Sequence, residues 1–335
     1  MMSLRLFSLW LGPLLLAIIA LFLGPVDVIS PTEVWAMVQT WLGGGEVLPA
    51  ERLYLVRAVV LEVRLPRVLL TLLVGGALSL SGAALQALFR NPLVSPDVLG
   101  LTAGAAFGAA LALATSWLPL HPSAFLGGLL AVGITYGIAY ARGGVSVVAL
   151  ILAGVIISGF FTALLTIVQF FADPFRLQTI VQWTMGNLHT AKWSKVYSAG
   201  PPIVAAVIWM LLRRWRLNVL ALGEMEARTV GLQPEWEKIL VLLPATLAAA
   251  SAVAVAGIIG MVGLAIPHAA RLLVGADNRR LLPVAASLGA AFLVVVDTCS
   301  RSFLAQELPV GIFTMLTGGP FFVILLRQKL REFQG

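Results

Sequence analysis

The stretch from Arg64 to Gly100 reads RLPRVLLTLLVGGALSLSGAALQALFRNPLVSPDVLG and contains one long apolar run with arginines at both ends. The run over residues 66–89 is long enough for a helix to cross the roughly 30 Å hydrocarbon core of a bilayer. A proline-containing polar turn over residues 91–96 follows it. This stretch therefore predicts a helix that spans a membrane and ends at its surface.

Apolar runs recur along the whole chain, which is 60% hydrophobic and 11% charged, whereas a soluble domain carries about 25% charge. We expect an all-α polytopic membrane protein, formed by a single transmembrane domain over residues 1–335. About ten spans are predicted, near residues 6–23, 66–89, 98–118, 123–140, 146–171, 199–214, 239–257, 258–276, 281–299 and 309–327. No clear cleavage site follows the first run, so we predict that it is retained as a helix.

Two of these spans contain helix-breaking residues. The segment 258–276 is short and includes Pro267, so we expect a broken helix there. The last span contains Gly318-Gly319-Pro320, where we expect a second break. Broken helices at membrane depth occur where they line a cavity or are buried in protein, although a proline or glycine kink that serves packing alone is also common.

A spacing of glycine and proline occurs twice. Gly82 stands ten residues before Pro92, and Gly257 stands ten residues before Pro267, 175 residues further along the chain. Two copies of one broken-helix unit in a hydrophobic chain are typical of transporters built from repeated halves. We therefore predict a transporter with an inverted repeat.

The basic residues lie mainly at the ends of spans, so the net charge of +7 indicates membrane topology rather than nucleic-acid binding. With the N-terminus inside and ten spans, 13 Lys and Arg residues fall on the cytoplasmic side and eight on the outer side. This excess predicts that both termini are cytoplasmic.

The longest predicted cytoplasmic connection, about residues 220–234, has a helical pattern between Gly223 and Gly231. Glu224, Glu226 and Arg228 lie within two turns of each other in this segment. A short helix here could lie along the membrane surface and dock a soluble partner. An ordinary solvated loop helix has the same pattern, so the pattern alone does not decide.

A second polar feature is predicted on the outer side. Arg64 and Arg67 are three residues apart and share a helix face, and Arg301 comes from a distant span end. They could dock an acidic extracellular partner, or pair locally with acidic residues. The candidates for local pairing are Glu51, Glu62, Asp297 and Glu307.

Catalytic chemistry is poorly supported by this sequence. His121, His189 and His268 are scattered with no metal-ligand spacing, so we predict no metal site. No phosphate-binding Gly-x-x-x-x-Gly-Lys loop occurs, so we expect that the chain is not an enzyme and does not itself hydrolyse ATP. Cys299 is the only cysteine, which excludes an internal disulfide.

Five motifs in this order resemble one family. They are RLPR at 64–67, SGAALQALFRNPLVSPDVLG at 81–100, LGEMEARTVGL at 222–232, GLAIPHAARLLVG at 263–275 and ELPVGIFTMLTGGPFF at 307–322. With them the chain resembles permeases of the iron-siderophore, haem and vitamin B12 (FecCD-type) ABC importers, from about Arg64 to Arg327.

The resemblance implies a type II importer permease of the cell inner membrane, with ten helices and an inverted repeat of helices 2–5 and 7–10. It implies a homodimer, two cytoplasmic ATPase subunits, and a periplasmic or lipid-anchored substrate-binding protein. ATP and Mg²⁺ would bind to the partner ATPase, and this chain would bind no cofactor. By match to the family motifs, ATPase coupling is expected at Leu222, Gly223, Glu224, Ala227, Arg228 and Gly231, and binding-protein docking at Arg64, Arg67 and Arg301.

In this family the fifth helix and the short helix before the tenth line the pathway, which implies the segments 150–171 and 308–317 here. Helical spacing places Ser158, Thr162, Thr166 and Gln169 on one face. We expect these four residues, with Pro309 and Thr314, to face the pathway, although the hydroxyls could instead pack against neighbouring helices.

The substrate cannot be read from this sequence, because in such importers selection occurs largely in the binding protein. A ferric siderophore, haem or cobalamin is expected, and a molybdate- or tungstate-type oxyanion remains an alternative. An ion-coupled secondary transporter remains a further alternative, because such transporters also show inverted repeats. It would need an ionisable residue inside a span, and Asp297 and Glu307 are the only acidic candidates.

Overall fold

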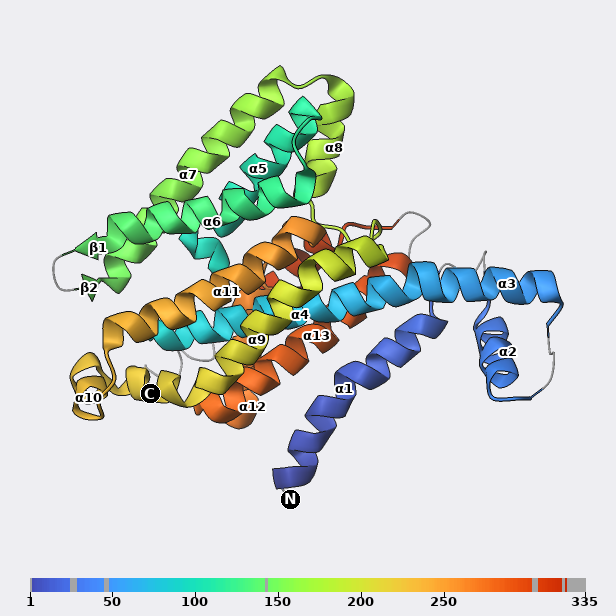
Figure 1. Ribbon diagram of the computed structural model, residues 1–335, viewed down its shortest axis with the longest axis horizontal. Helices are drawn as coiled ribbons and strands as arrows, with labels where there is room; N and C mark the ends of the chain where they lie inside the picture. Colours follow the sequence, from blue (N-terminus) through green and yellow to red (C-terminus); the bar gives the residue numbers. More distant parts are fainter. Residues whose placement is uncertain are drawn as a thin grey trace.

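The computed structural model describes residues 2–24, 29–44, 48–141, 144–302, 307–320 and 323. Most of these residues are helical (Figure 1). Six helices of the described residues are long and apolar enough to cross a membrane: the helix that ends in α4 (Leu65–Leu88), α6 (Leu120–Ala139), α7 (Val147–Phe171), α9 (Trp193–Leu222), α11 (Pro234–Ala256) and α13 (Asn278–Ser302). Shorter apolar helices are α5 (Leu101–Thr115), α12 (Val262–Val274) and the part Leu11–Phe22 of α1 (Met2–Phe22). Residues 310–320 form a further helix. Each of the ten expected spans therefore corresponds to a helix, which confirms the predicted fold class.

Shorter elements connect these helices. They are α2 (Pro31–Trp41), α3 (Ala50–Ala58), the π-helical turn η1 (Val59–Arg64), the 3₁₀ turn η2 (Pro96–Leu99), the two-residue strands β1 (Tyr140–Ala141) and β2 (Gly144–Val145), α8 (Pro174–Thr184) and α10 (Glu224–Thr229). The sequence predicted α10 alone among them. Two start at residues that favour helix N-termini, since Ser30 caps α2 in a capping box with Glu33 and Asp173 caps α8.

The helices α3, η1 and α4 run on without a break over Ala50–Leu88, a total of 39 residues. At 1.5 Å per residue this is about 58 Å, well beyond the roughly 30 Å of a bilayer core. Figure 1 shows α3 in line with α4, with α2 folded back beside it. The α2–α3 hairpin therefore projects from one end of the bundle, which we call the α3 end.

The opposite end carries α10 and is called the α10 end. Here Arg90, just after α4, donates to the carbonyl of Leu220 near the end of α9, and the backbone N–H of Asn278 at the start of α13 donates to Asn218 Oδ1. Helix α4 therefore ends where α13 and α11 begin, so it runs antiparallel to both.

Two helix pairs repeat the same antiparallel packing. Helix α4 packs on α13, and α11 packs on α6. In Figure 1, α5, α6 and α7 form a layer above α11, while α4, α9, α12 and α13 pack below it. The inverted repeat therefore relates α4–α7 to α11, α12, α13 and the helix 310–320.

Close approach of α4 to its neighbours depends on glycine. A Cβ atom on Gly82 would collide with the carbonyl of Gly263 in α12, and one on Gly75 would collide with the carbonyl of Gly289 in α13. Both pairs bring helix backbones into direct contact. Small residues serve this purpose in lipid, where no hydrophobic force drives helices together.

The repeated glycine–proline spacing is not the register of the repeat, so this part of the prediction is wrong. Gly82 lies inside α4, whereas Gly257 ends α11. Pro92 lies in the turn after α4, whereas Pro267 lies inside α12. The two spacings therefore fall on different parts of their helices and do not mark equivalent positions.

Neither expected helix break lies at the predicted residues. Helix α12 continues through Pro267, and the break precedes it at residues 257–261. The terminal helix is continuous over residues 310–320, including Gly318 and Gly319, so the predicted break is wrong within the described residues. The motif residues Phe321 and Phe322 and the span beyond Val323 lie outside the described residues.

Candidate transport and docking sites

Helix α10 is a short exposed helix at the end of the bundle, held between two long ones. Glycines with backbone angles unfavourable for other residues bound it, with φ of 155° at Gly223 and 80° at Gly231. Ala227 is completely buried and anchors the helix, while Leu222 and Met225 are 72% and 74% exposed. Apolar side chains exposed on a short anchored helix are typical of a docking element.

Ion pairs fix the ends of the helices on either side of α10. Glu237 near the start of α11 is buried and accepts hydrogen bonds from Arg213 and Arg216 of α9. Lys238 pairs with Glu235 at 2.9 Å and with Glu224 at 2.7 Å. A force on α10 would therefore reach α9 and α11 through this frame. The expected coupling contact Glu224 is engaged within the chain, whereas Arg228 is exposed.

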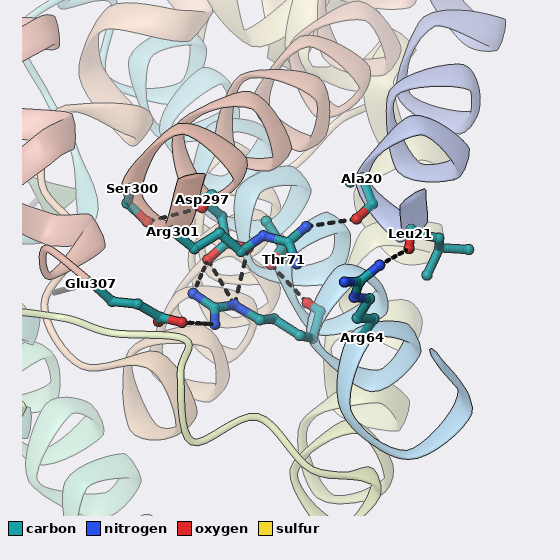
Figure 2. Close-up of polar contacts among 9 residues, drawn as sticks. Ala20, Leu21, Arg64, Thr71, Asp297, Ser300, Arg301 and Glu307 are labelled. Carbon is teal, nitrogen blue, oxygen red and sulfur yellow. Dashed lines mark hydrogen bonds and ion pairs between the residues drawn. The ribbon is translucent and has the colours of Figure 1, made fainter. Parts of the chain in front are cut away.

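Arg64 and Arg301, two of the three arginines predicted for docking, lie together at the α3 end (Figure 2), and Arg67 joins them because it pairs with Asp297, as Arg301 does. Arg67 Nη2 lies 2.9 Å from Asp297 Oδ1, and Arg67 Nη1 lies 3.0 Å from Glu307 Oε2. Arg301 lies 3.8 Å from Asp297 and donates to the carbonyl of Ala20. This cluster therefore joins α4, α13, α1 and the segment that leads into the helix 310–320.

Arg64 serves a different purpose in the same region. Its guanidinium donates to the carbonyls of Leu21, Phe22 and Ile29 at 2.9, 3.2 and 3.4 Å. The first two are among the last carbonyls of α1, which have no partner in the helix itself. Arg64 therefore caps α1 and fixes its end to α4.

The three arginines are mostly covered by the chain itself. Arg64, Arg67 and Arg301 are only 3%, 7% and 4% exposed. Local pairing is observed for Arg67 and Arg301, whereas docking of a partner by these residues stays a prediction. The distance along the chain between Arg67 and Asp297 explains why spacing alone did not decide between the two.

One side of Arg67 is nevertheless open to a pocket. A cavity of about 180 Å³ is lined by Arg67, His189, Glu307 and Pro309 together with Gln182 and Asn187. Glu307 is itself exposed, with a third of its side chain accessible. Desolvation holds the pKa of His189 below its ordinary value, so His189 is mostly neutral at pH 7. The open cation of this pocket is therefore Arg67.

The residues predicted for the pathway separate into two groups. Thr162 and Thr166 are exposed on α7, and Ser158 and Gln169 are half-buried. The two threonine hydroxyls donate to the carbonyls four residues earlier, which satisfies them without a neighbouring helix. Helix α7 is the outermost helix of its layer in Figure 1, so these four positions remain predictions for a surface that another chain would complete.

Thr314 does not reach such a surface. Its side chain is completely buried, and its hydroxyl donates to the carbonyl of Gly311 at 2.9 Å. The prediction that it faces the pathway is therefore wrong for this conformation. Pro309 is half-buried and lines the pocket beside Arg67.

Long apolar helices with glycine contacts between their backbones define a multi-span membrane protein, and a short exposed helix lies at one end of it. The FecCD transport family model matches residues 12–328. An iron chelatin transport system permease of Helicobacter pylori is 40% identical over 276 residues, which are 82% of this chain and 84% of that protein. The molybdate import system permease MolB of Haemophilus influenzae is 39% identical, covering 82% of each chain.

A solved structure of similar fold describes an inward-facing conformation of a metal-chelate type ABC transporter. It matches with a TM-score of 0.84 and 35% identity, over 97% of this chain and 99% of that one. The protein studied here belongs to the FecCD transport family.

Proposed function

We propose that this chain is the transmembrane subunit of an ATP-driven importer that moves a metal chelate such as a ferric siderophore, haem or cobalamin. Transport would occur by alternating access of the pathway to the two sides of the membrane. The observation that supports this most directly is the geometry of α10. A short exposed helix held between α9 and α11, with Met225 exposed on it, can transmit a push from a soluble motor to two long helices.

The motor would be two cytoplasmic ATPase subunits that bind ATP and Mg²⁺. Leu222 and Met225 would enter a groove of the ATPase subunit, and the exposed Arg228 would pair with an acidic residue at its rim. With the ATPase subunits bound there, α10 and both termini would lie in the cytoplasm, and the chain would lie in the cell inner membrane. The α3 end then faces outward.

A second copy of the chain would complete the pathway. Helix α7 exposes a long face, on which Val155 and Phe170 lie at helical spacing with Thr162 and Thr166. Two such faces opposite each other would form a largely apolar channel with a few hydroxyl groups. A channel of that character suits a bulky chelate that needs no fixed ligand on its way.

A periplasmic or lipid-anchored binding protein would deliver the substrate at the α3 end. The pocket beside Arg67 offers a receptor for an acidic side chain of that protein. Because Glu307 already occupies one side of Arg67, docking would require the partner's carboxylate to replace Glu307. Arg64 and Arg301 would support this exchange by keeping the local potential positive.

Two alternative functions remain, and the observations favour one of them over the other. A molybdate- or tungstate-type oxyanion remains a candidate substrate, because the molybdate relative is about as similar to this chain as the iron-chelate relative. An ion-coupled secondary transporter is disfavoured, because Asp297 and Glu307 are both paired with Arg67 and are not free to bind a coupling proton or sodium ion.

Reconstitution tests the proposal. The chain is placed in proteoliposomes with its ATPase and binding protein, and uptake of a ferric chelate and of molybdate is measured with ATP, without ATP and with vanadate. Vanadate-sensitive uptake of the chelate supports the proposal. Vanadate-sensitive uptake of molybdate alone would assign the oxyanion instead, and uptake that follows an ion gradient without ATP would overturn the importer.

A further inference from the structure

A cavity of about 290 Å³ lies at the α10 end, where α4, α9, α12 and α13 meet. Its volume is near the lower end of the roughly 300–1,000 Å³ typical of ligand sites. It is separate from the coupling helix and from the Arg67 pocket, and neither ATPase docking nor the proposed pathway uses it. Its lining has a specific charge pattern.

Two arginines line the cavity from different helices. Arg90 follows α4, and Arg271 lies in the last turn of α12. Each uses only part of its guanidinium within the chain. Arg90 donates to Leu220 O from Nε and Nη2 at 3.1 and 2.6 Å, and Arg271 donates to Gln86 Oε1 from Nη2 at 3.2 Å. The remaining N–H groups of both side chains are available to a ligand.

No carboxylate balances these two charges within the described part of the chain. The ion pairs found there include neither arginine, and no Asp or Glu lines the cavity. The nearest acidic residue along the chain, Asp277, accepts hydrogen bonds from Asn218 Nδ2 and from the backbone N–H of Arg279. Arg271 is half-buried whereas Arg90 is exposed, and a half-buried cation without a counter-charge is costly, so the cavity has the electrostatics of an anion site.

The shape and surroundings of the cavity favour a phosphate with apolar chains attached. Arginine forks match phosphate oxygens in geometry. Leu272, which follows Arg271 on α12 and lies outside the cavity lining, is 64% exposed and offers an apolar surface for acyl chains. Asn278 is 3% exposed, and its Oδ1 has no hydrogen-bond partner among the residues the structure describes, so it could accept from a headgroup hydroxyl.

We propose that this cavity binds the phosphate of an anionic phospholipid headgroup in the leaflet at the α10 end, with Arg90 and Arg271 as its ligands. A basic pocket between transmembrane helices on the cytoplasmic side is a recognised setting for such binding. The bound lipid would tie α4 to α12 and α13 beside the end of α9, close to the frame that holds α10. The site depends on membrane insertion and not on which substrate is carried.

The test uses the purified full-length chain in detergent micelles. Phosphatidylglycerol, neutral phosphatidylcholine or inorganic phosphate is titrated in, and bound lipid is counted by native mass spectrometry while the thermal midpoint is followed. Arg271→Gln removes one ligand. Ala276→Trp keeps both arginines but fills the cavity at an exposed lining position. Arg214→Gln is the matched control, a basic residue of α9 outside this cavity.

For the native chain we expect retained phosphatidylglycerol and a raised thermal midpoint, with no comparable effect of phosphatidylcholine. Arg271→Gln should weaken lipid binding about fivefold, from the roughly 1 kcal/mol per basic residue near a membrane surface. Ala276→Trp should weaken it at least as much, and Arg214→Gln should not. Stabilisation by inorganic phosphate alone, lost in the same two variants, would overturn the lipid and assign a soluble phosphate. Equal binding by the native chain and both cavity variants would overturn the site.

Discussion

Arg67 in α4 and Asp297 in α13 share three hydrogen bonds of 2.9–3.1 Å, although they are 230 residues apart in the chain. Both side chains are buried, and Arg67 uses its remaining edge for Glu307. The pair therefore fixes the α3 ends of two helices that belong to different halves of the repeat. It also connects them to the segment entering the helix 310–320.

The first prediction concerns this pair. Asp297→Asn should lower the free energy of unfolding by about 3–5 kcal/mol, because it removes the buried carboxylate that Arg67 and Arg301 share and leaves Arg67 only the partly exposed Glu307. Glu307→Gln should cost less, about 1 kcal/mol or below, because Glu307 is a third exposed. Thermal or denaturant unfolding of the purified chain in detergent measures both. Equal losses of unfolding free energy in the two variants would mean that burial does not determine how much each ion pair with Arg67 contributes to stability.

The second prediction rests on the proposed docking of a binding protein. If a partner carboxylate must replace Glu307 on Arg67, then Glu307→Gln removes the competitor and should tighten binding by up to about fivefold at low salt. Glu51→Gln is the control, since Glu51 is another exposed acidic residue at the α3 end. The affinity of the binding protein for each immobilised variant is measured at several salt concentrations. Weaker binding by the Glu307→Gln variant would show that Glu307 itself contacts the partner.

The sequence predicted every long helix because the apolar runs are close to membrane length, and length is set by the bilayer rather than by tertiary contacts. It did not predict α2, α3 or α8, which are short and mixed in polarity. It also misplaced the helix breaks. Helix α12 continues through Pro267, although a proline has no N–H to donate to the carbonyl four residues earlier, here that of Gly263.

Site prediction was limited in a different way. Motifs brought Arg64, Arg67 and Arg301 into one group correctly, because the family places them at one end. Their burial could not be predicted, because it depends on which of four nearby acidic residues they meet in three dimensions. The cavity between Arg90 and Arg271 was not predicted, although each arginine lies in one of the five motifs, because the two are 181 positions apart and nothing in the sequence shows that they meet.

The third prediction concerns coupling. Arg228→Glu reverses an exposed charge on α10 and should reduce ATP-driven uptake at least about tenfold if Arg228 pairs with the ATPase subunit. Glu224, the other expected coupling contact, is tested by Glu224→Gln, because Lys238 then still pairs with Glu235. Glu224→Lys would instead place a second cation against Lys238 and disturb the fold locally. Co-purification of the ATPase subunit with each variant is measured beside uptake. Normal uptake by the Arg228→Glu variant would show that Arg228 does not pair with the ATPase subunit.

The last prediction concerns the glycine contacts that set the spacing of the helices. Gly82→Ala should destabilise the chain by about 1–3 kcal/mol, because the new methyl group overpacks the contact with the Gly263 backbone. Gly76→Ala is the matched control one and a half turns earlier in α4. Its Cβ would lie 3.5 Å from the carbonyl oxygen of Ala286, an ordinary contact.

The control should leave stability unchanged or raise it, since alanine favours a helix over glycine by roughly 0.5–1 kcal/mol. The two substitutions are expected to change stability in opposite directions. This difference separates the effect of helix propensity from the effect of crowding between helices. Unfolding of both variants in detergent decides between these causes. If Gly82→Ala were as stable as Gly76→Ala, α4 and α12 could move apart at no cost, and direct backbone contact between them would not be what holds the two halves together.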